Sequence, residues 1–354
     1  MRKHLRNVDC LNDPACPDHT DTYSFHGDIL PISYPDTSVR AVAFEGTPAP
    51  IHAGIVGTKV EREPATCGAV VPRRLVFVQV LGGDVPMVSA REGRRVVPVA
   101  LQLYSLRSLM ADPEGFRGAI RSVGEMGYDG VQFASYGGLS APEMRALLAS
   151  AGVRPAGTHT NMSVLEGELD RELDYNGEIG NHWIFCPHIA PDRRANLAGW
   201  REVATSLNHI GERCRDRGFV FGYHNHDFEL APISDAPDRT GLDVLLGETD
   251  PSLVVFEPDV YWIAKGGADP VAILRQYAGR IPIIHCKDMT HDDRRTYAPV
   301  GAGRLDWPSI LDAADAGGVE WHCVEQDAGD APMIDCVRTS ITNLRSWGMG
   351  EKDR

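Results

Sequence analysis

The chain has 354 residues, of which 43% are hydrophobic and 24% charged, as is typical of a globular protein. Lys and Arg number 35 and Asp and Glu number 49, which gives a formal net charge of −14. An acidic surface repels phosphate backbones, so we expect no nucleic-acid partner. No apolar run approaches the roughly 20 residues of a membrane-spanning helix, so we expect no membrane partner. The basic start is followed by polar residues, which is unlike a secretory signal.

Charge and proline content divide the chain into two parts. Residues 1–96 carry 11 basic and 11 acidic side chains, whereas residues 97–354 carry 24 and 38 and therefore the whole excess. Nine prolines interrupt residues 1–96, and only 75–81 read as a strand, which buries no face alone. We expect 1–96 to be a flexible, poorly structured extension or to include a mis-assigned start, with translation beginning at Met87. A folded domain is expected over 97–350.

From residue 97 onward, strand-like and helix-like segments alternate in eight units. Eight such units in about 250 residues predict an α/β fold of the (β/α)₈ TIM barrel type. A doubly wound sheet alternates in the same way, but the Gly-x-Gly-x-x-Gly turn of that fold is absent. The expected strands are 99–104, 130–133, 155–159, 183–186, 219–224, 253–259, 281–285 and 321–325. The expected helices are 112–126, 140–150, 166–179, 197–217, 241–247, 268–278, 307–316 and 332–347.

Titratable residues lie repeatedly at the carboxyl ends of the expected strands, where the active sites of such barrels are built. Imidazoles and carboxylates that converge there would repel one another or lack partners without a cation. Two histidines with carboxylates suit a divalent ion such as Mn²⁺, Co²⁺, Zn²⁺ or Mg²⁺. A single histidine at a strand end is more often a core or surface residue, and the repetition carries the prediction. These residues are His159, His224, His226, Glu257, Asp259, His285 and Glu325.

Several short motifs resemble those of one family. They are Ala-Leu-Gln-Leu-Tyr-Ser-Leu-Arg at 100–107, Tyr-His-Asn-His-Asp-Phe-Glu at 223–229, Phe-Glu-Pro-Asp-Val-Tyr-Trp at 256–262, His-Cys-Lys-Asp-Met at 285–289, Val-Gly-Ala-Gly at 300–303 and Val-Glu-Gln-Asp at 324–327. Together they are similar to the sugar phosphate isomerase/epimerase group, the xylose isomerase-like TIM barrels. The resemblance covers about residues 98–347 and does not define a substrate, because members include epimerases, isomerases, dehydratases and lyases.

The resemblance implies a divalent metal ion held by one residue from each of strands five to eight. Asp259, His285 and Glu325 match the family in residue type, whereas His224 stands where the ketose epimerases have a glutamate. In those enzymes two glutamates exchange a proton on opposite faces of the sugar. Here Glu325 remains as the acid/base carboxylate, and the opposite face would depend on His224 or on a neighbour such as His226 or Glu257.

Four further residues are candidates for binding substrate. His159 and His226 lie near the same rim, and Trp262 is suited to stacking on a sugar face, although such aromatic residues as often pack at the barrel rim. Lys287 shares a strand face with His285 and is suited to a hydroxyl or a phosphate. The alternative for Lys287 is an ion pair with Asp288 or Glu325.

The leading functional prediction is a metal-dependent isomerase or epimerase that acts on a sugar or keto-sugar through an enediolate. The alternative is a lyase or dehydratase acting on a keto-sugar, keto-glycoside or keto-inositol at the same site. An abasic-site endonuclease is disfavoured by the acidic charge, and a non-catalytic barrel by the three matching ligand types. Eight cysteines without a Cys-x-x-Cys pair favour free buried thiols and a cytoplasmic location. A homo-oligomer is compatible with the sequence.

Overall fold

The computed structural model describes residues 96–351. The strand predicted over 75–81 and the alternative start at Met87 therefore lie outside the described residues. Nearly all of the expected extension lies outside them as well.

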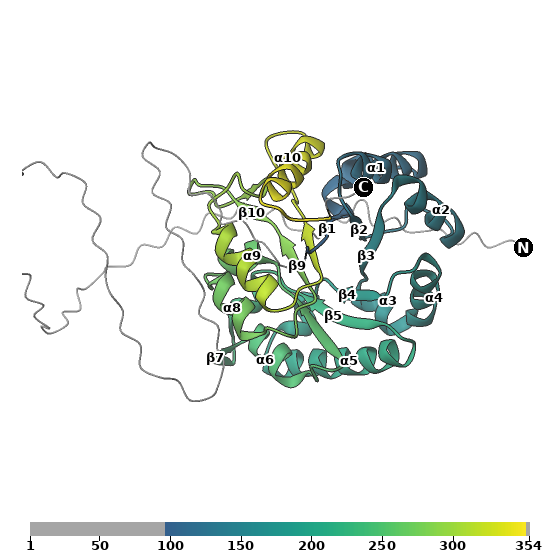
Figure 1. Ribbon diagram of the computed structural model, residues 1–354. Coiled ribbons are helices and arrows are strands. Elements are labelled where there is room, and N and C mark those ends of the chain that lie inside the picture. Colours follow the sequence, from purple (N-terminus) through teal and green to yellow (C-terminus); the bar gives the residue numbers. More distant parts are fainter. Residues whose placement is uncertain (1–95, 352–354) are drawn as a thin grey trace, which may run out of the picture. The chain divides into compact units, whose positions relative to one another are not determined.

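Eight parallel strands form the centre of the described domain (Figure 1). Neighbouring strands pair in the order β8-β5-β4-β3-β2-β1-β12-β9. The two end strands meet beyond β8, where Asp259 forms a bridge with His285 and the backbone N–H of His285 donates to Pro258 O at 2.9 Å. The predicted TIM barrel is therefore confirmed. Its strands are β1 (Val99–Gln102), β2 (Gly130–Phe133), β3 (Arg154–His159), β4 (Trp183–Cys186), β5 (Val220–His224), β8 (Val254–Glu257), β9 (Ile283–Cys286) and β12 (Trp321–Val324).

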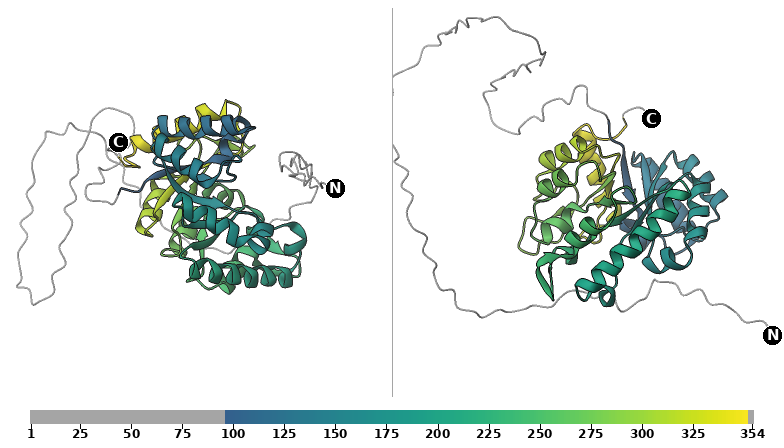
Figure 2. Two further views of the ribbon diagram at one scale, coloured as in Figure 1. Left: turned by 90° about the vertical axis from the view of Figure 1, so that its right-hand side faces the viewer. Right: turned by 90° about the horizontal axis from the view of Figure 1, so that it is seen from below.

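Helices surround this barrel, and Figure 2 shows the long teal helix α5 along its outer side. Local capping explains several boundaries: Asp112 accepts from Gly115 N before α1, and Ser140 and Glu143 form a capping box at α2. The main outer helices are α1 (Pro113–Glu125), α2 (Ala141–Ala151), α4 (Leu169–Ile179), α5 (Leu197–Asp216), α6 (Gly241–Glu248), α8 (Pro270–Gln276), α9 (Trp307–Ala316) and α10 (Met333–Ser346).

Three segments differ from the sequence prediction. The helix expected over 166–179 is two helices, α3 (Met162–Gly167) and α4, separated at Glu168 with φ −129°. The first strand ends at Gln102 and continues as the 3₁₀ helix η2 (Leu103–Leu109). The strand expected over 253–259 ends at Glu257, because the Asp259 side chain caps a short helix that was not predicted, α7 (Val260–Lys265).

Short elements that the sequence prediction missed lie in the connections. Two small antiparallel pairs join β6 to β7 and β10 to β11. They are β6 (Pro232–Ile233), β7 (Ala236–Thr240), β10 (Asp288–Met289) and β11 (Tyr297–Ala298), together with the 3₁₀ helices η3 (Pro191–Arg194) and η4 (Phe228–Leu230).

The alternation of side chains along each strand separates the barrel interior from the helix-facing core. On β9, Ile284 and Cys286 pack in the core cluster under the helices, whereas Ile283 belongs to the interior cluster. Phe185 belongs to that interior cluster as well, and Gly222 leaves room for its ring. A Cβ at residue 222 would lie 2.6 Å from the Phe185 ring. The interior cluster is Ala100, Ala156, Trp183, Phe185, Ile283, Trp321 and Cys323.

Two further observations concern membrane-spanning helices and cysteines. Among the described helices, none combines the length and apolar character needed to span a membrane. The described cysteines are buried free thiols, as expected, at positions Cys186, Cys214, Cys286, Cys323 and Cys336. Cys10, Cys16 and Cys67 lie outside the described residues.

Candidate functional site

The candidate site lies at the carboxyl ends of the barrel strands. Because side chains alternate, the last inward position of each strand follows the interior cluster by two residues. His285 is two residues beyond Ile283 on β9, and Gln102 is two beyond Ala100 on β1. In this way the barrel brings together six polar side chains that the described structure buries: Gln102, Gln132, His224, Glu257, His285 and Glu325.

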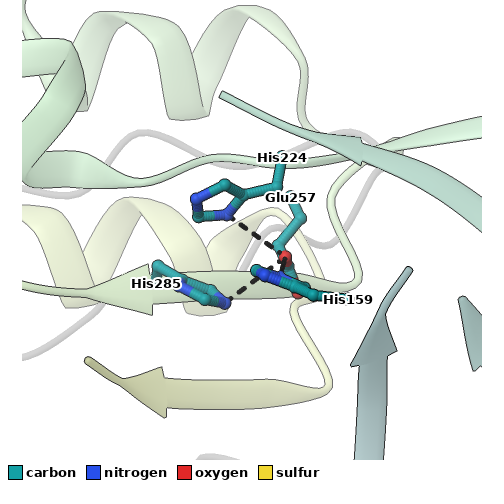
Figure 3. A group of neighbouring side chains, drawn as sticks. All are labelled: His159, His224, Glu257 and His285. Carbon is teal, nitrogen blue, oxygen red and sulfur yellow. Dashed lines mark hydrogen bonds and ion pairs between the residues drawn. The ribbon is translucent and has the colours of Figure 1, made fainter. Parts of the chain in front are cut away.

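The Glu257 carboxylate lies at the centre of three imidazoles (Figure 3). Its Oε2 atom is 2.6 Å from His159 Nε2 and 3.3 Å from both His224 Nδ1 and His285 Nε2. Its Oε1 atom accepts a hydrogen bond from Gln132 Nε2 at 2.6 Å. The Glu257 side chain has no exposed surface. Its charge is therefore compensated by imidazole and amide groups rather than by water.

A second cluster of charged side chains surrounds the Lys287 ammonium. Lys287 Nζ lies 3.0 Å from Asp259 Oδ2, 2.9 Å from Glu325 Oε2 and 3.0 Å from Asp327 Oδ2. Its side chain is only 1% exposed, whereas that of Asp327 retains 19%. Three carboxylates around one ammonium leave an excess of negative charge, which favours an additional cation.

His285 contacts both the side chains around Glu257 and those around Lys287. Its Nδ1 atom lies 3.0 Å from Glu325 Oε2, and its Nε2 atom lies 2.7 Å from Gln132 Oε1. The imidazole is completely buried. A negative group therefore faces each side of this ring: Glu325 on one side and Glu257 on the other.

Burial and neighbouring charges perturb the pKa values of these groups. Burial, helped by the neighbouring His285, lowers the pKa of His224 to about 3, which leaves the imidazole neutral. Burial alone would lower the pKa of His285, but Glu257 outweighs it and raises the pKa well above its ordinary value. Burial raises the pKa of Asp259 to about 6 despite Lys287. Burial alone would raise the pKa of Glu325, but Lys287 and His285 outweigh it and lower the pKa well below its usual range.

Two overlapping sets of side chains have the composition and spacing of a metal centre. Within each set the ligand atoms all lie within 4.8 Å of one another. Among the described residues, His224 Nδ1 and Asp259 Oδ2 are buried without a hydrogen bond, although Lys287 contacts the latter. Nitrogen and oxygen donors of this kind fit a borderline or hard divalent ion. One set is the predicted one, His224, Asp259, His285 and Glu325, and the other is His159, His224, Glu257 and His285.

The residues predicted to bind substrate lie beside these sets. The His226 ring is 5.3 Å from that of His224 and 5.2 Å from that of Trp262, between ring centroids. His226 Nδ1 and Trp262 Nε1 are buried and lack hydrogen-bond partners among the described residues. Lys287 Nζ lies 5.4 Å from the centroid of the Trp262 ring. Hydroxyl groups of a ligand would satisfy these atoms.

The structure shows the ion pair expected as the alternative for Lys287, and binding of a substrate by Lys287 stays a prediction. Lys287 pairs with Glu325, and the neighbouring Asp288 instead binds main-chain amides of the 301–305 turn. Asp288 also accepts from the Trp307 indole at 2.7 Å. This carboxylate therefore holds the Val-Gly-Ala-Gly motif in place next to β10 and takes no part in the cluster of charged side chains around Lys287.

Sequence reasoning missed Gln102, Gln132 and Asp327. Both glutamines interrupt buried apolar runs, as in Leu101-Gln102-Leu103 and Val131-Gln132-Phe133. A polar side chain at an inward strand position was the signal that would have identified them. Asp327 follows β12 in the connection to α10, where no periodicity predicts the direction of a side chain.

Comparisons with known proteins agree with this architecture. Residues 120–346 match the model of the xylose isomerase-like TIM barrel family. The inosose dehydratase of Geobacillus kaustophilus is 27% identical over 195 residues, which cover 49% of this chain and 62% of that protein. The inosose dehydratase of Clostridium beijerinckii is 34% identical over 153 residues, which cover 38% of this chain and 50% of that protein. The chain thus spans only about half to three-fifths of these relatives.

A solved structure supports the same fold. The sugar phosphate isomerase/epimerase from Parabacteroides distasonis superposes with a TM-score of 0.61 at 22% identity, over 70% of this chain and 98% of that chain. An L-ribulose 3-epimerase superposes with a TM-score of 0.57 at 12% identity. Together with the nearly closed eight-stranded barrel, the family match over residues 120–346 shows that the chain belongs to the xylose isomerase-like TIM barrel family.

Proposed function

We propose that the chain is a metal-dependent lyase or dehydratase that eliminates a β-oxygen substituent from a keto-cyclitol or keto-sugar. The observation that carries the proposal is the accessibility of the two glutamates. The Glu325 side chain is 6% exposed, whereas Glu257 is fully buried and held by Gln132 and His159. Only one of these two carboxylates can reach a substrate, and elimination needs only one.

The predicted ligands His224, Asp259, His285 and Glu325 would hold the metal ion in this proposal. A bound divalent ion such as Mn²⁺, Co²⁺, Mg²⁺ or Zn²⁺ would act as a Lewis acid on the substrate carbonyl. The neutral imidazole of His224 suits this role because metal ions bind deprotonated ring nitrogen. His226 and Trp262 would bind hydroxyl groups of the substrate through the nitrogen atoms that have no hydrogen-bond partner among the described residues.

Glu325 would act as the base. It removes the proton on the carbon next to the carbonyl, and the electron pair of that C–H bond forms the new C=C bond as the β C–O bond breaks. The departing oxygen takes the proton from Glu325 and leaves as water, or as an alcohol when the substrate is a glycoside. The Lys287 ammonium stabilises the negative charge that develops on oxygen during the step.

Two relatives support dehydration over isomerisation. The inosose dehydratases match this chain at 27% and 34% identity, whereas the superposed L-ribulose 3-epimerase is only 12% identical and supports the fold alone. Epimerisation or isomerisation is the second candidate. It would need a second acid/base group besides Glu325, and His226, whose Nδ1 has no hydrogen-bond partner among the described residues, is the candidate for that role.

A substrate panel tests the proposal. Metal-loaded protein is incubated with keto-inositols, 3-keto-sugars and 3-keto-glycosides, and the products are identified by mass spectrometry. Elimination yields an unsaturated ketone and water or alcohol, whereas epimerisation yields an isomer of unchanged mass. Glu325→Gln should reduce kcat by about 10²–10⁴-fold, and the exposed Asp330→Asn should not. Isomeric products alone, or an unaffected Glu325→Gln variant, would overturn the proposal.

A further inference from the structure

A chain of side-chain amides runs from the barrel backbone to the site. The backbone N–H of Tyr104 donates to Gln102 Oε1 at 3.2 Å, which leaves Gln102 Nε2 to donate to Gln132 Oε1 at 2.7 Å. Gln132 Nε2 then donates to Glu257 Oε1 at 2.6 Å. A backbone N–H only donates a hydrogen bond, and an ionised carboxylate only accepts one. The Tyr104 N–H at one end of the amide chain and the Glu257 carboxylate at the other therefore require the same orientation of the two side-chain amides.

This orientation determines which nitrogen of His285 carries a proton. Gln132 Oε1 lies 2.7 Å from His285 Nε2 and has no hydrogen of its own to give. A hydrogen bond at this distance therefore requires an N–H at Nε2. The Nε2 atom also lies 3.3 Å from Glu257 Oε2, and this negative charge favours a proton on Nε2 as well. The amide chain thus stabilises the Nε2-protonated form of the ring.

The lone pair of a neutral His285 is then at Nδ1. A metal ion takes up one ring nitrogen of a histidine, and the other usually donates its N–H to a carboxylate or a carbonyl oxygen. Nδ1 faces Glu325 Oε2 at 3.0 Å, so a proton on Nδ1 is donated to this carboxylate in the metal-free protein, and a metal ion bound at Nδ1 would replace that proton. Asp259 belongs to this same side of the site through Lys287.

Building on the proposed metal dependence, we infer that Gln102 and Gln132 are positioning residues that make Nδ1 of His285 the metal-binding nitrogen. This selects the set with Asp259 and Glu325 over the set with His159. In the selected set, Glu257 is an acceptor that organises imidazoles and is not a ligand. Its three imidazole contacts and its Gln132 hydrogen bond occupy both of its oxygens.

The first test uses the wild-type protein. Protein labelled with ¹⁵N-histidine is titrated with Zn²⁺, and long-range ¹H–¹⁵N correlation spectra identify the protonated and metal-bound nitrogen of each ring. His285 should show a protonated Nε2 and a metal-shifted Nδ1, and His159 should show no metal shift. A metal-shifted Nε2 at His285, a metal shift at His159, or the absence of any Zn²⁺-dependent shift would each overturn the inference.

A variant tests the amide chain itself. Gln132→Met keeps the side-chain length but removes the hydrogen bonds with Gln102, Glu257 and His285, and it should weaken Zn²⁺ affinity by about 10–100-fold. It should also shift the tautomer signals of His285. The control Gln326→Met makes the same exchange at another buried glutamine, whose Nε2 donates to Ala328 O, and should leave these signals unchanged. Unchanged His285 signals in Gln132→Met would contradict a positioning role.

The outcomes separate this inference from the proposed function. If Zn²⁺ shifts His285 Nδ1 but no substrate of the panel is eliminated, the tautomer assignment stands and the reaction is wrong. If elimination is observed while the metal binds Nε2, the reaction stands and the positioning role is wrong. If Gln132→Met does not fold, the wild-type spectra alone decide the assignment.

Discussion

Replacing Lys287 by methionine perturbs the charge balance of the site most directly. The substitution keeps much of the buried aliphatic chain and removes the ammonium that contacts Asp259, Glu325 and Asp327 at 2.9–3.0 Å. Removal of one partner from a buried ion pair costs about 3–5 kcal/mol, because the remaining charge loses its compensation. For a domain of this size, each kcal/mol lowers the Tm by about 2–4 °C. We therefore expect the Tm of metal-free Lys287→Met to fall by roughly 6–20 °C.

Urea unfolding of the metal-free protein at pH 7, followed by circular dichroism, measures the loss in free energy of unfolding. Lys265→Met is the matched control, because Lys265 is the other lysine of the described range and is exposed. Its substitution should change the free energy of unfolding by no more than about 0.5 kcal/mol. Added Zn²⁺ should stabilise Lys287→Met more than wild type, since it restores positive charge at the carboxylates. A Lys287→Met variant as stable as the control would refute the idea that this ammonium neutralises the cluster.

Three further predictions concern metal binding, pH and packing. His285→Ala should lose bound divalent metal in elemental analysis, whereas Asp327→Asn should retain it, and full metal content in both would contradict the ligand assignment. Burial raises the pKa of Glu229 from 4.5 to about 7, so its contribution to stability is complete below pH 4.5 and is lost as the pH rises through 7. The free energy of unfolding of Glu229→Gln, measured by urea unfolding relative to wild type, should therefore rise by up to about 3 kcal/mol between pH 4.5 and 8. A difference that does not change with pH would argue against this. Gly222→Ala should lower the free energy of unfolding by about 1–3 kcal/mol, because its Cβ would lie 2.6 Å from the Phe185 ring; unchanged stability would contradict that steric conflict.

The barrel could be predicted from sequence because each strand and helix carries a local signal. Asp112 before Pro113 indicated the start of α1, and apolar runs such as Ile283-Ile284 indicated buried strands. The position of Asp259 could not be predicted in the same way. Its strand-like surroundings hide the helix cap that it forms for Tyr261 and Trp262, and this cap turns the chain out of the strand.

The site was predicted as a set of residue types at strand ends, and the structure places the four expected metal ligands close together. The connections among them were not predictable, because hydrogen bonds across the barrel join residues far apart in sequence. Gln132 and His285 are 153 positions apart and Lys287 and Asp327 are 40 apart. Local sequence patterns contain no information on such pairs. For this reason the chain of side-chain amides from Gln102 through Gln132 to Glu257 is visible only in the structure.

The most direct test of metal-dependent elimination is a time course by ¹H NMR in D₂O with a keto-inositol, using metal-loaded and metal-free protein side by side. The metal-loaded protein should convert the substrate to an unsaturated ketone with loss of the proton next to the carbonyl, and the metal-free protein should not. Equal conversion without metal, or a metal-loaded protein that forms no unsaturated ketone from any substrate of the panel, whether or not it exchanges that proton, would contradict the account.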